Sequence, residues 1–110
     1  MKHDLPLLDD VAFDAAIAAT TTDRAVLVDF TAPWCPPCDA LKPVLGAVAA
    51  ARTDVQIAML DVDDHPDIAG RYGVRAMPTL LLFRGGRPAA QLVGAVSQAR
   101  LERWLTDALR

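Results

Sequence analysis

Residues 25–51 place two cysteines where a strand pattern gives way to a helix pattern. Residues 25–30, AVLVDF, are almost continuously apolar, which is typical of a strand covered on both faces. The segment 38–51 is helical in composition and carries leucine and valine at core spacing. Cys35 and Cys38 lie between the two patterns and are the only cysteines in the chain. A covered strand that leads directly into a helix favours a sheet with helices on both faces.

Four further segments have the composition of strands. They are residues 4–8, 55–60, 79–83 and 89–95. The first is weak because Pro6 interrupts it, as proline does in strands at the edge of a sheet. Gly85 and Gly86 separate the last two strands, and they predict a hairpin turn.

Helical patterns fill the spaces between these strands. Asp9 or Asp10 caps the first helix, a short helix is expected near 67–72, and Ser97 caps the last. Pro43 should kink the helix that follows the cysteines. The order β-α-β-α-β-α-β-β-α predicts an α/β fold with a mixed five-stranded sheet and about four helices. With 110 residues, we expect one domain over 1–110.

Charge and hydropathy argue against several classes of protein. The chain has 11 basic and 14 acidic residues, a net charge of −3 and no run of lysine or arginine, which argues against nucleic-acid and anionic-membrane binding. No apolar run approaches the roughly 18 residues of a membrane span. The first ten residues lack the apolar core of a secretory signal. We therefore expect a cytoplasmic protein, and we expect a monomer.

The cysteine spacing predicts two different chemical roles. Cys35 lies at or just before a helix start, where free N–H groups and the helix dipole favour a thiolate, the form that attacks disulfides. Cys38 follows one helical turn later and can resolve the mixed disulfide. Pro36 and Pro37 are tolerated in a first helical turn and fix the backbone between the sulfurs. Neither proline can donate an N–H to the thiolate, which leaves mainly the Cys38 amide.

A metal site and an inert dithiol are the alternatives for the cysteine pair. Zinc usually takes four ligands, often from a second such pair. The only other candidates, His3 and His65, lie far away in sequence. We therefore expect no metal.

The chain also resembles the thioredoxin family over nearly its whole length. The resemblance is carried by LVDFTAPWCPPC at 27–38, Pro43, YGVRAMPTLLLF at 72–83, the GG turn and VGA at 93–95. It implies a thioredoxin fold and a protein disulfide reductase in which Cys35 attacks and Cys38 resolves. It further implies that no cofactor is bound and that disulfide-containing proteins are the substrates. The implied electron source is NADPH, through a flavoprotein thioredoxin reductase.

The same resemblance implies roles for residues near the cysteines. Pro78 resembles a cis-proline that faces the sulfurs, and the Met77 backbone would pair with an extended substrate segment. Trp34 resembles an exposed tryptophan beside the nucleophile. Asp29 matches a buried proton acceptor beneath the resolving cysteine. The alternatives are a trans proline that opens a strand, a strand-edge Asp29 bonded to backbone, and Gly94 as a simple bulge rather than a site of close substrate approach.

Four residues depart from the family pattern. Pro36 replaces a usual glycine, and Thr31 replaces a common tryptophan. Met59 stands where a lysine often lies near the buried Asp29, so desolvation should raise the pKa of Asp29 further. Asp39 replaces a usual basic residue and should raise the pKa of the attacking thiol. These departures affect the redox potential and the choice of reductase rather than the fold.

Two other functions use the same chain differently. An oxidase or isomerase would use the same cysteine pair to form or rearrange disulfides rather than to reduce them. The unusual pair Pro36 and Pro37 between the cysteines makes this alternative worth testing. The absence of a histidine between the cysteines argues against it. A binding module on this scaffold would need neither Cys35 nor Cys38.

Overall fold

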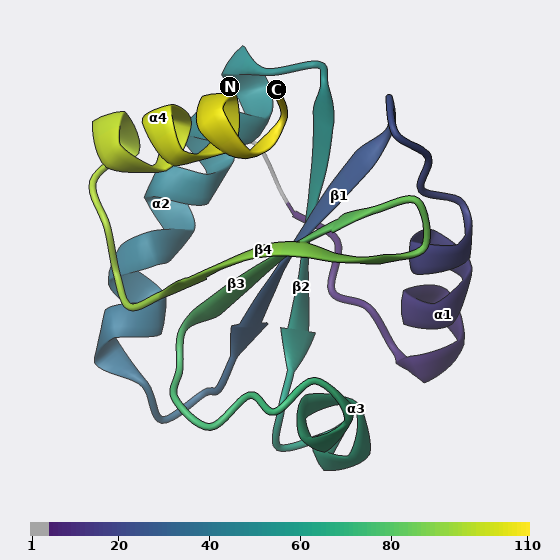
Figure 1. Cartoon of the computed structure of the whole chain (residues 1–110). Coiled ribbons are helices and arrows are strands. Elements are labelled where there is room, and N and C mark those ends of the chain that lie inside the picture. The colour runs from purple at the N-terminus through teal and green to yellow at the C-terminus, as the bar shows by residue number, and fades with distance from the viewer. Residues whose placement is uncertain (1–4) are drawn as a thin grey trace.

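The computed structural model describes residues 5–110, in which four strands form one sheet with two helices on each face (Figure 1). The strands are β1 Ala25–Thr31, β2 Val55–Asp61, β3 Thr79–Arg84 and β4 Arg87–Val93. The helices are α1 Asp10–Ala18, α2 Pro36–Ala51, α3 Pro66–Arg71 and α4 Gln98–Ala108. The predicted α/β class and the four helices are confirmed. Over these residues, no helix is long and apolar enough to cross a membrane.

The sheet is mixed, as predicted, and its order is β2-β1-β3-β4. β1 runs parallel to β2 and antiparallel to β3, and β3 runs antiparallel to β4. β1 therefore lies inside the sheet, and all seven of its residues are buried. Its almost continuous apolar composition follows from this position, because neighbouring strands and helices cover it on every side.

The prediction of five strands is wrong. Of the segment 4–8, the described residues form a single parallel bridge, between Leu7 and Met59. The Met59 N–H donates to the Pro6 carbonyl, and the Leu8 N–H donates to the Met59 carbonyl. Extending this ladder toward the N-terminus requires an N–H from residue 6, and Pro6 has none. Helix α1 begins directly afterwards and takes the chain away from the sheet.

The predicted hairpin joins β3 to β4 through Gly85 and Gly86. Their φ angles are 59° and 82°, which suit a tight turn that matches the twist of the strands. β4 begins earlier than predicted and ends at Val93. Gly94 follows the last residue of the strand and has a φ of 97°.

The two faces of the sheet bury two separate clusters of side chains. Val26, Val28 and Phe30 of β1 share one cluster with Phe13 of α1 and Ile68 of α3. On the opposite face, the apolar positions of β1, α2 and α4 form the second cluster, which contains Ala25, Leu27, Leu41, Leu45, Leu101 and Leu105. Because side chains alternate along a strand, Asp29 and Thr31 lie on the same face of β1 as Leu27, the face that α2 covers.

Helix starts follow the predicted caps. The Asp9 carboxylate accepts a hydrogen bond from the Ala12 N–H at 2.7 Å, and Ser97 Oγ accepts one from the Arg100 N–H at 3.2 Å. Helix α2 continues through Pro43 to its end, although proline supplies no N–H there. The kink expected at Pro43 stays a prediction.

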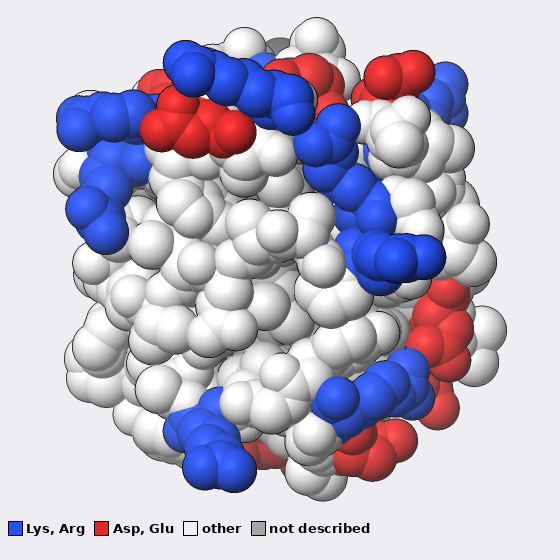
Figure 2. Space-filling view, viewed as in Figure 1, with Lys and Arg blue, Asp and Glu red and all other residues white. Residues whose placement is uncertain are grey.

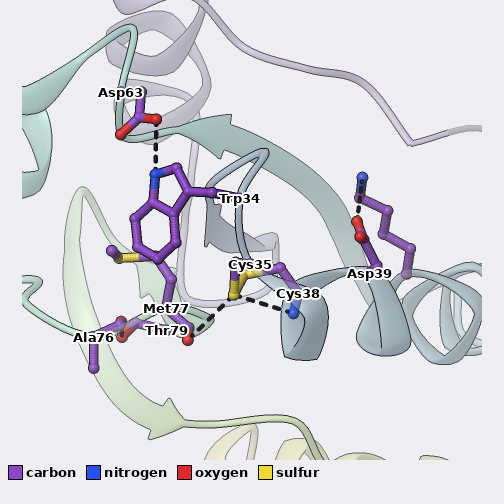
Figure 3. The surroundings of a disulfide bond; sticks show 9 residues. Trp34, Cys35, Cys38, Asp39, Asp63, Ala76, Met77 and Thr79 are labelled. Carbon is purple, nitrogen blue, oxygen red and sulfur yellow. Dashed lines mark hydrogen bonds and ion pairs between the residues drawn. A yellow bond between two sulfur atoms is a disulfide. The ribbon is translucent and has the colours of Figure 1, made fainter.

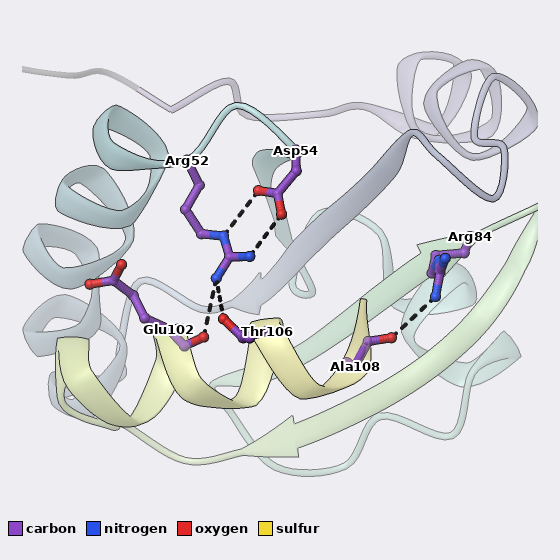
Figure 4. A network of polar contacts seen from close by, with 6 residues as sticks. All are labelled: Arg52, Asp54, Arg84, Glu102, Thr106 and Ala108. Carbon is purple, nitrogen blue, oxygen red and sulfur yellow. Dashed lines mark hydrogen bonds and ion pairs between the residues drawn. The ribbon is translucent and has the colours of Figure 1, made fainter. Parts of the chain in front are cut away.

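Two arginines tie distant elements together at the end of the sheet away from the cysteines (Figure 4). Arg52, which caps the C-terminus of α2, donates to the Glu102 carbonyl at 3.1 Å and to Thr106 Oγ1 at 3.0 Å, both on α4. Arg84 at the end of β3 donates to the Thr22 carbonyl at 2.7 Å and to the Ala108 carbonyl at 3.2 Å. Helix α4 is therefore fixed by one arginine at its middle and by another at its last turn.

Candidate active site

Cys35 is the N-cap residue of α2, and Pro36 and Pro37 occupy the first positions of the helix. Cys35 has an extended backbone, with φ −111° and ψ 100°. Its Sγ accepts a hydrogen bond from the Cys38 N–H at 3.3 Å (Figure 3). The predicted position at a helix start is confirmed, and so is the Cys38 amide as a donor to the sulfur. At a helix N-terminus, negative charge on this sulfur is stabilised.

Cys35 and Cys38 form a disulfide, with their Cα atoms 5.3 Å apart. Cys38 is fully buried and Cys35 is 3% exposed, so little of either sulfur is open to solvent in the disulfide form. Other segments of the chain line the small part of Cys35 that remains exposed.

The segment Met77–Pro78 lines that edge. The Met77 carbonyl oxygen lies 3.5 Å from Cys35 Sγ, and the peptide bond between Met77 and Pro78 is cis (Figure 3). The Pro78 carbonyl accepts a hydrogen bond from the Gly94 N–H at 2.8 Å. Two of the segments suggested by the resemblance therefore meet near Cys35 Sγ, and the trans alternative for Pro78 is wrong.

Gly94 has a backbone conformation that favours glycine. Its φ of 97° lies in the region that other residues rarely adopt. A Cβ atom at this position would meet nothing within 4 Å, so the space beside Gly94 is open. The shift of register in the β3–β4 ladder lies between Leu82 and Phe83, away from Gly94.

Trp34 is 62% exposed beside the disulfide, and Asp63 holds its ring. Trp34 Nε1 donates a hydrogen bond to Asp63 Oδ2 at 2.9 Å (Figure 3). Asp63, which lies 29 residues away in the loop after β2, was not among the predicted site residues. The parallel register could have indicated this contact, because Thr31 pairs with Asp61 and the segments after β1 and β2 leave the sheet at the same end.

Asp29 is fully buried in the middle of β1. Its partners across the sheet, Met59 and Leu80, are both apolar. Within residues 5–110, neither carboxyl oxygen has a hydrogen-bond partner, so the alternative of a backbone-bonded aspartate is wrong. Burial raises the pKa of Asp29 to about 7, and the charge of Lys42 opposes part of this rise. The expected effect of desolvation is confirmed, and Lys42 is a cation that the sequence analysis missed.

Asp39 lies on the exposed side of α2. It pairs with Lys42 at 3.4 Å, and the two side chains are 65% and 49% exposed. An ion pair this exposed contributes little to stability.

Within residues 5–110, no three side chains of His, Cys, Asp or Glu are placed to hold a metal ion. His65 is the residue before the first turn of α3. His3 lies outside the described residues.

The sequence model of the family described as Thioredoxin matches residues 5–107. The chain belongs to the thioredoxin family. It is 44% identical over 104 residues to a thioredoxin of Alicyclobacillus acidocaldarius subsp. acidocaldarius, covering 94% of this chain and 96% of that one. A bifunctional thioredoxin reductase/thioredoxin of Mycobacterium leprae is 41% identical over 99 residues, covering 89% of this chain and 21% of that protein.

A solved structure of a thioredoxin from Nicotiana alata superposes with a TM-score of 0.84 and 31% identity, covering 98% of this chain and 95% of that one. Members of the thioredoxin family are dithiol–disulfide oxidoreductases. With a close Cys35–Cys38 pair on this fold, the chain is a thiol–disulfide reductase of the same kind.

Proposed function

We propose that the chain reduces disulfides in other proteins, with Cys35 as the attacking nucleophile, Cys38 as the resolving cysteine and Asp29 as the proton acceptor. The main support is the placement of Cys35 Sγ at the start of α2, 3.5 Å from the Met77 carbonyl. A sulfur at the helix start is activated by the dipole, and the neighbouring backbone offers a place for an extended substrate. Residues 1–110 act in this proposal as one domain.

The reaction has two exchange steps. The Cys35 thiolate attacks one sulfur of the substrate disulfide, a bond forms between them, and the second substrate sulfur leaves as a thiolate. Cys38 then gives its proton to Asp29 and its sulfur attacks Cys35 Sγ, so that the Cys35–Cys38 disulfide forms and the first substrate sulfur leaves. Two electrons have passed from the dithiol to the substrate. A carboxyl with a pKa of about 7 suits this proton transfer near neutral pH.

The surface around the pair suits a substrate bound mainly by backbone and apolar contacts. Much of the face over β4 and the loop after it carries no charged side chain, and charges lie around its rim (Figure 2). Trp34 and Val93 expose 62% and 51% of their surface. We propose that an extended substrate segment lies between Trp34 and Gly94 and pairs with the Met77 backbone.

We further propose that a flavoprotein thioredoxin reductase regenerates the dithiol with electrons from NADPH. The relative from Mycobacterium leprae supports this, because its name joins a thioredoxin reductase to a thioredoxin in one protein. The chain itself binds no cofactor in this scheme, acts as a monomer in the cytoplasm, and contributes to electron transport and cell redox homeostasis.

Substituting each cysteine tests the assigned roles. Cys38→Ser should accumulate a mixed disulfide between Cys35 and a substrate such as insulin, because the resolving sulfur is missing. Cys35→Ser should form no such adduct and should lose turnover with dithiothreitol as reductant. The adducts are counted by mass spectrometry. An adduct on Cys38 in the Cys35→Ser variant would reverse the two roles, and a partner that binds the double variant unchanged would favour a binding module.

The redox potential tests the direction of the reaction. We expect a value near the roughly −270 mV of thioredoxins, measured in defined thiol buffers with Trp34 fluorescence as the signal. A value of roughly −120 to −180 mV would instead make the chain an oxidase or isomerase. The comparison of wild type with Pro36→Gly shows how far the residue between the cysteines sets the value.

A further inference from the structure

Two buried side chains of β1 lack partners in the protein. Among residues 5–110, the three buried side-chain oxygens without a hydrogen-bond partner are both oxygens of Asp29 and Oγ1 of Thr31. Asp29 is fully buried and Thr31 is 7% exposed. Buried polar atoms in folded proteins almost always have a partner, either in the protein or in ordered water. That all three such oxygens fall on one strand points to a shared partner.

The geometry of β1 brings the two side chains together. Residues two apart on a strand point to the same face, and their Cα atoms are about 6.6 Å apart. A water with two hydrogen bonds of about 2.8 Å joins oxygens up to about 5.6 Å apart, which fits side chains on such a pair. A direct bond between Asp29 and Thr31 is not made. One water molecule can therefore satisfy Thr31 Oγ1 and one Asp29 oxygen together.

No side chain of residues 5–110 bonds this pair. On β2, Asp61 pairs with Thr31 in register, but a carboxylate cannot donate to Asp29, and its Oδ1 accepts from the Asp63 N–H at 2.8 Å. On α2, the charge of Lys42 acts on Asp29, but its Nζ pairs with Asp39 at 3.4 Å.

The neighbours on β3 offer no partner either. Leu80, opposite Asp29, is apolar, and the Thr79 hydroxyl donates to the Ala76 carbonyl. The protein thus leaves water as the partner for both Asp29 and Thr31.

We propose that Thr31 is a positioning residue for the proton transfers of the cysteine pair, because its hydroxyl holds an ordered water against the Asp29 carboxyl. In the charged state, Thr31 Oγ–H donates to the water and the water donates to Asp29. A hydrogen bond to the charged form favours that form. The water therefore makes the carboxylate a more available acceptor for the proton that leaves Cys38. Thr31 performs this task at a position where the family commonly has tryptophan, which offers no hydroxyl.

The role of Asp29 in this inference rests on the proposed function, but the water site does not. The test is therefore a titration of the Asp29 carboxyl carbon by NMR in the full chain, in the oxidised and the reduced forms. In Thr31→Val, which keeps the shape and removes the hydroxyl, the midpoint should rise by about one pH unit, as expected for losing a hydrogen bond to a charged group. Thr31→Ser should restore the wild-type midpoint.

The rise has a consequence for the proton acceptor at pH 7. With the midpoint moving from about 7 to about 8, the charged fraction of Asp29 falls from about one half to about one tenth, roughly fivefold. Disulfide reductase turnover should fall by a similar factor if Asp29 accepts the proton. A shifted titration with unchanged turnover would keep the water site and reject the proposed role of Asp29.

Thr20→Val is the matched control. Thr20 is 6% exposed, donates to the Ile17 carbonyl at 2.7 Å and accepts from the Gly86 N–H at 2.8 Å. Its loss should lower stability and leave the Asp29 titration unchanged. An unchanged midpoint in Thr31→Val, or an equal shift in Thr20→Val, would overturn the proposal. In wild type, a contact between the Thr31 methyl and a long-lived water in a nuclear Overhauser experiment should be present, and its absence would also overturn it.

Discussion

At the scale of single residues, Asp29 is the least favourable choice for stability in the sheet. It occupies a central strand between Met59 and Leu80, and no protein group bonds its carboxyl oxygens within the described chain. An apolar residue of similar size would suit this position better for packing. A carboxyl at this position therefore costs stability, and the proposed role as proton acceptor gives a functional reason for it.

Replacing Asp29 should change how stability depends on pH. The pKa of Asp29 is about 7 in the folded chain against an ordinary 3.8, so the folded state holds a proton that the unfolded state has lost between these values. The contribution of Asp29 to stability is therefore greatest below pH 4 and is lost as the pH rises to about 7. The difference of about 3 pH units corresponds to about 4 kcal/mol.

Urea unfolding of Asp29→Asn and wild type from pH 4 to 8 measures this loss. As the pH rises from 4 to 8, the free energy of unfolding of the variant should increase by up to about 4 kcal/mol relative to that of wild type. Thr20→Val, which changes no ionisable group, is the control and should show a flat difference. Parallel curves for Asp29→Asn and wild type would contradict the assigned pKa.

At the scale of elements, α2 is fixed at both ends by different means. Cys35 and the disulfide define its start, and Arg52 ties its end to α4. Arg52 also forms two hydrogen bonds to Asp54, at 2.7 and 3.0 Å, and its guanidinium lowers the pKa of that carboxyl. The side chain of Arg52 is 16% exposed and that of Asp54 is 51% exposed, so the arginine is shielded from water although its carboxylate partner is not.

Arg52→Lys should destabilise the chain by about 1–3 kcal/mol, because lysine cannot make the paired bonds to Asp54 and reach α4 at once. Arg71→Lys is the matched control. Arg71 bonds Asp14 at 3.1 Å, but their side chains are 48% and 62% exposed, so we expect a loss below about 1 kcal/mol. Equal losses in the two variants, measured by urea unfolding of the oxidised protein, would show that the tie to α4 contributes nothing.

At the scale of the whole molecule, both edges of the sheet discourage pairing with another copy. On the β2 edge, Pro6 and Leu8 already bond Met59. On the β4 edge, Pro88 lacks the N–H that a neighbouring strand would need. The radius of gyration of 12.7 Å is close to the ~13 Å of a compact domain of about 100 residues.

We therefore expect a monomer of 11.8 kDa in sedimentation equilibrium, in both the oxidised and the reduced states. Measuring both states distinguishes a dimer formed by pairing of strands from a dimer formed by a disulfide between two copies. A mass near twice this value that survives reduction would show that an edge of the sheet, or the apolar surface around Trp34, joins two copies.

Much of this architecture could be predicted from local patterns. Apolar runs, caps and the two turn glycines depend on neighbours in sequence, and they placed most elements to within a few residues. The fifth strand failed because pairing there depended on a single N–H that Pro6 lacks. The roles of Asp63, Arg52 and Lys42 could not be predicted, because they depend on contacts between residues far apart in the sequence. Their partners are brought to them by the sheet register or by the packing of helices, which periodicity does not encode.

The anchored last turn of α4 also makes the C-terminal end of the chain a suitable place to attach a label or a fusion partner. The bond from Arg84 to the Ala108 carbonyl holds this turn beside the end of β3 (Figure 4), far from the start of α2 (Figure 1). Helix α2, with 16 residues and a length of about 24 Å, separates that end from Cys35. A fusion partner, a dye or an electrode linked through Arg110 would therefore lie far from Cys35 and leave the surface around the disulfide open to substrates.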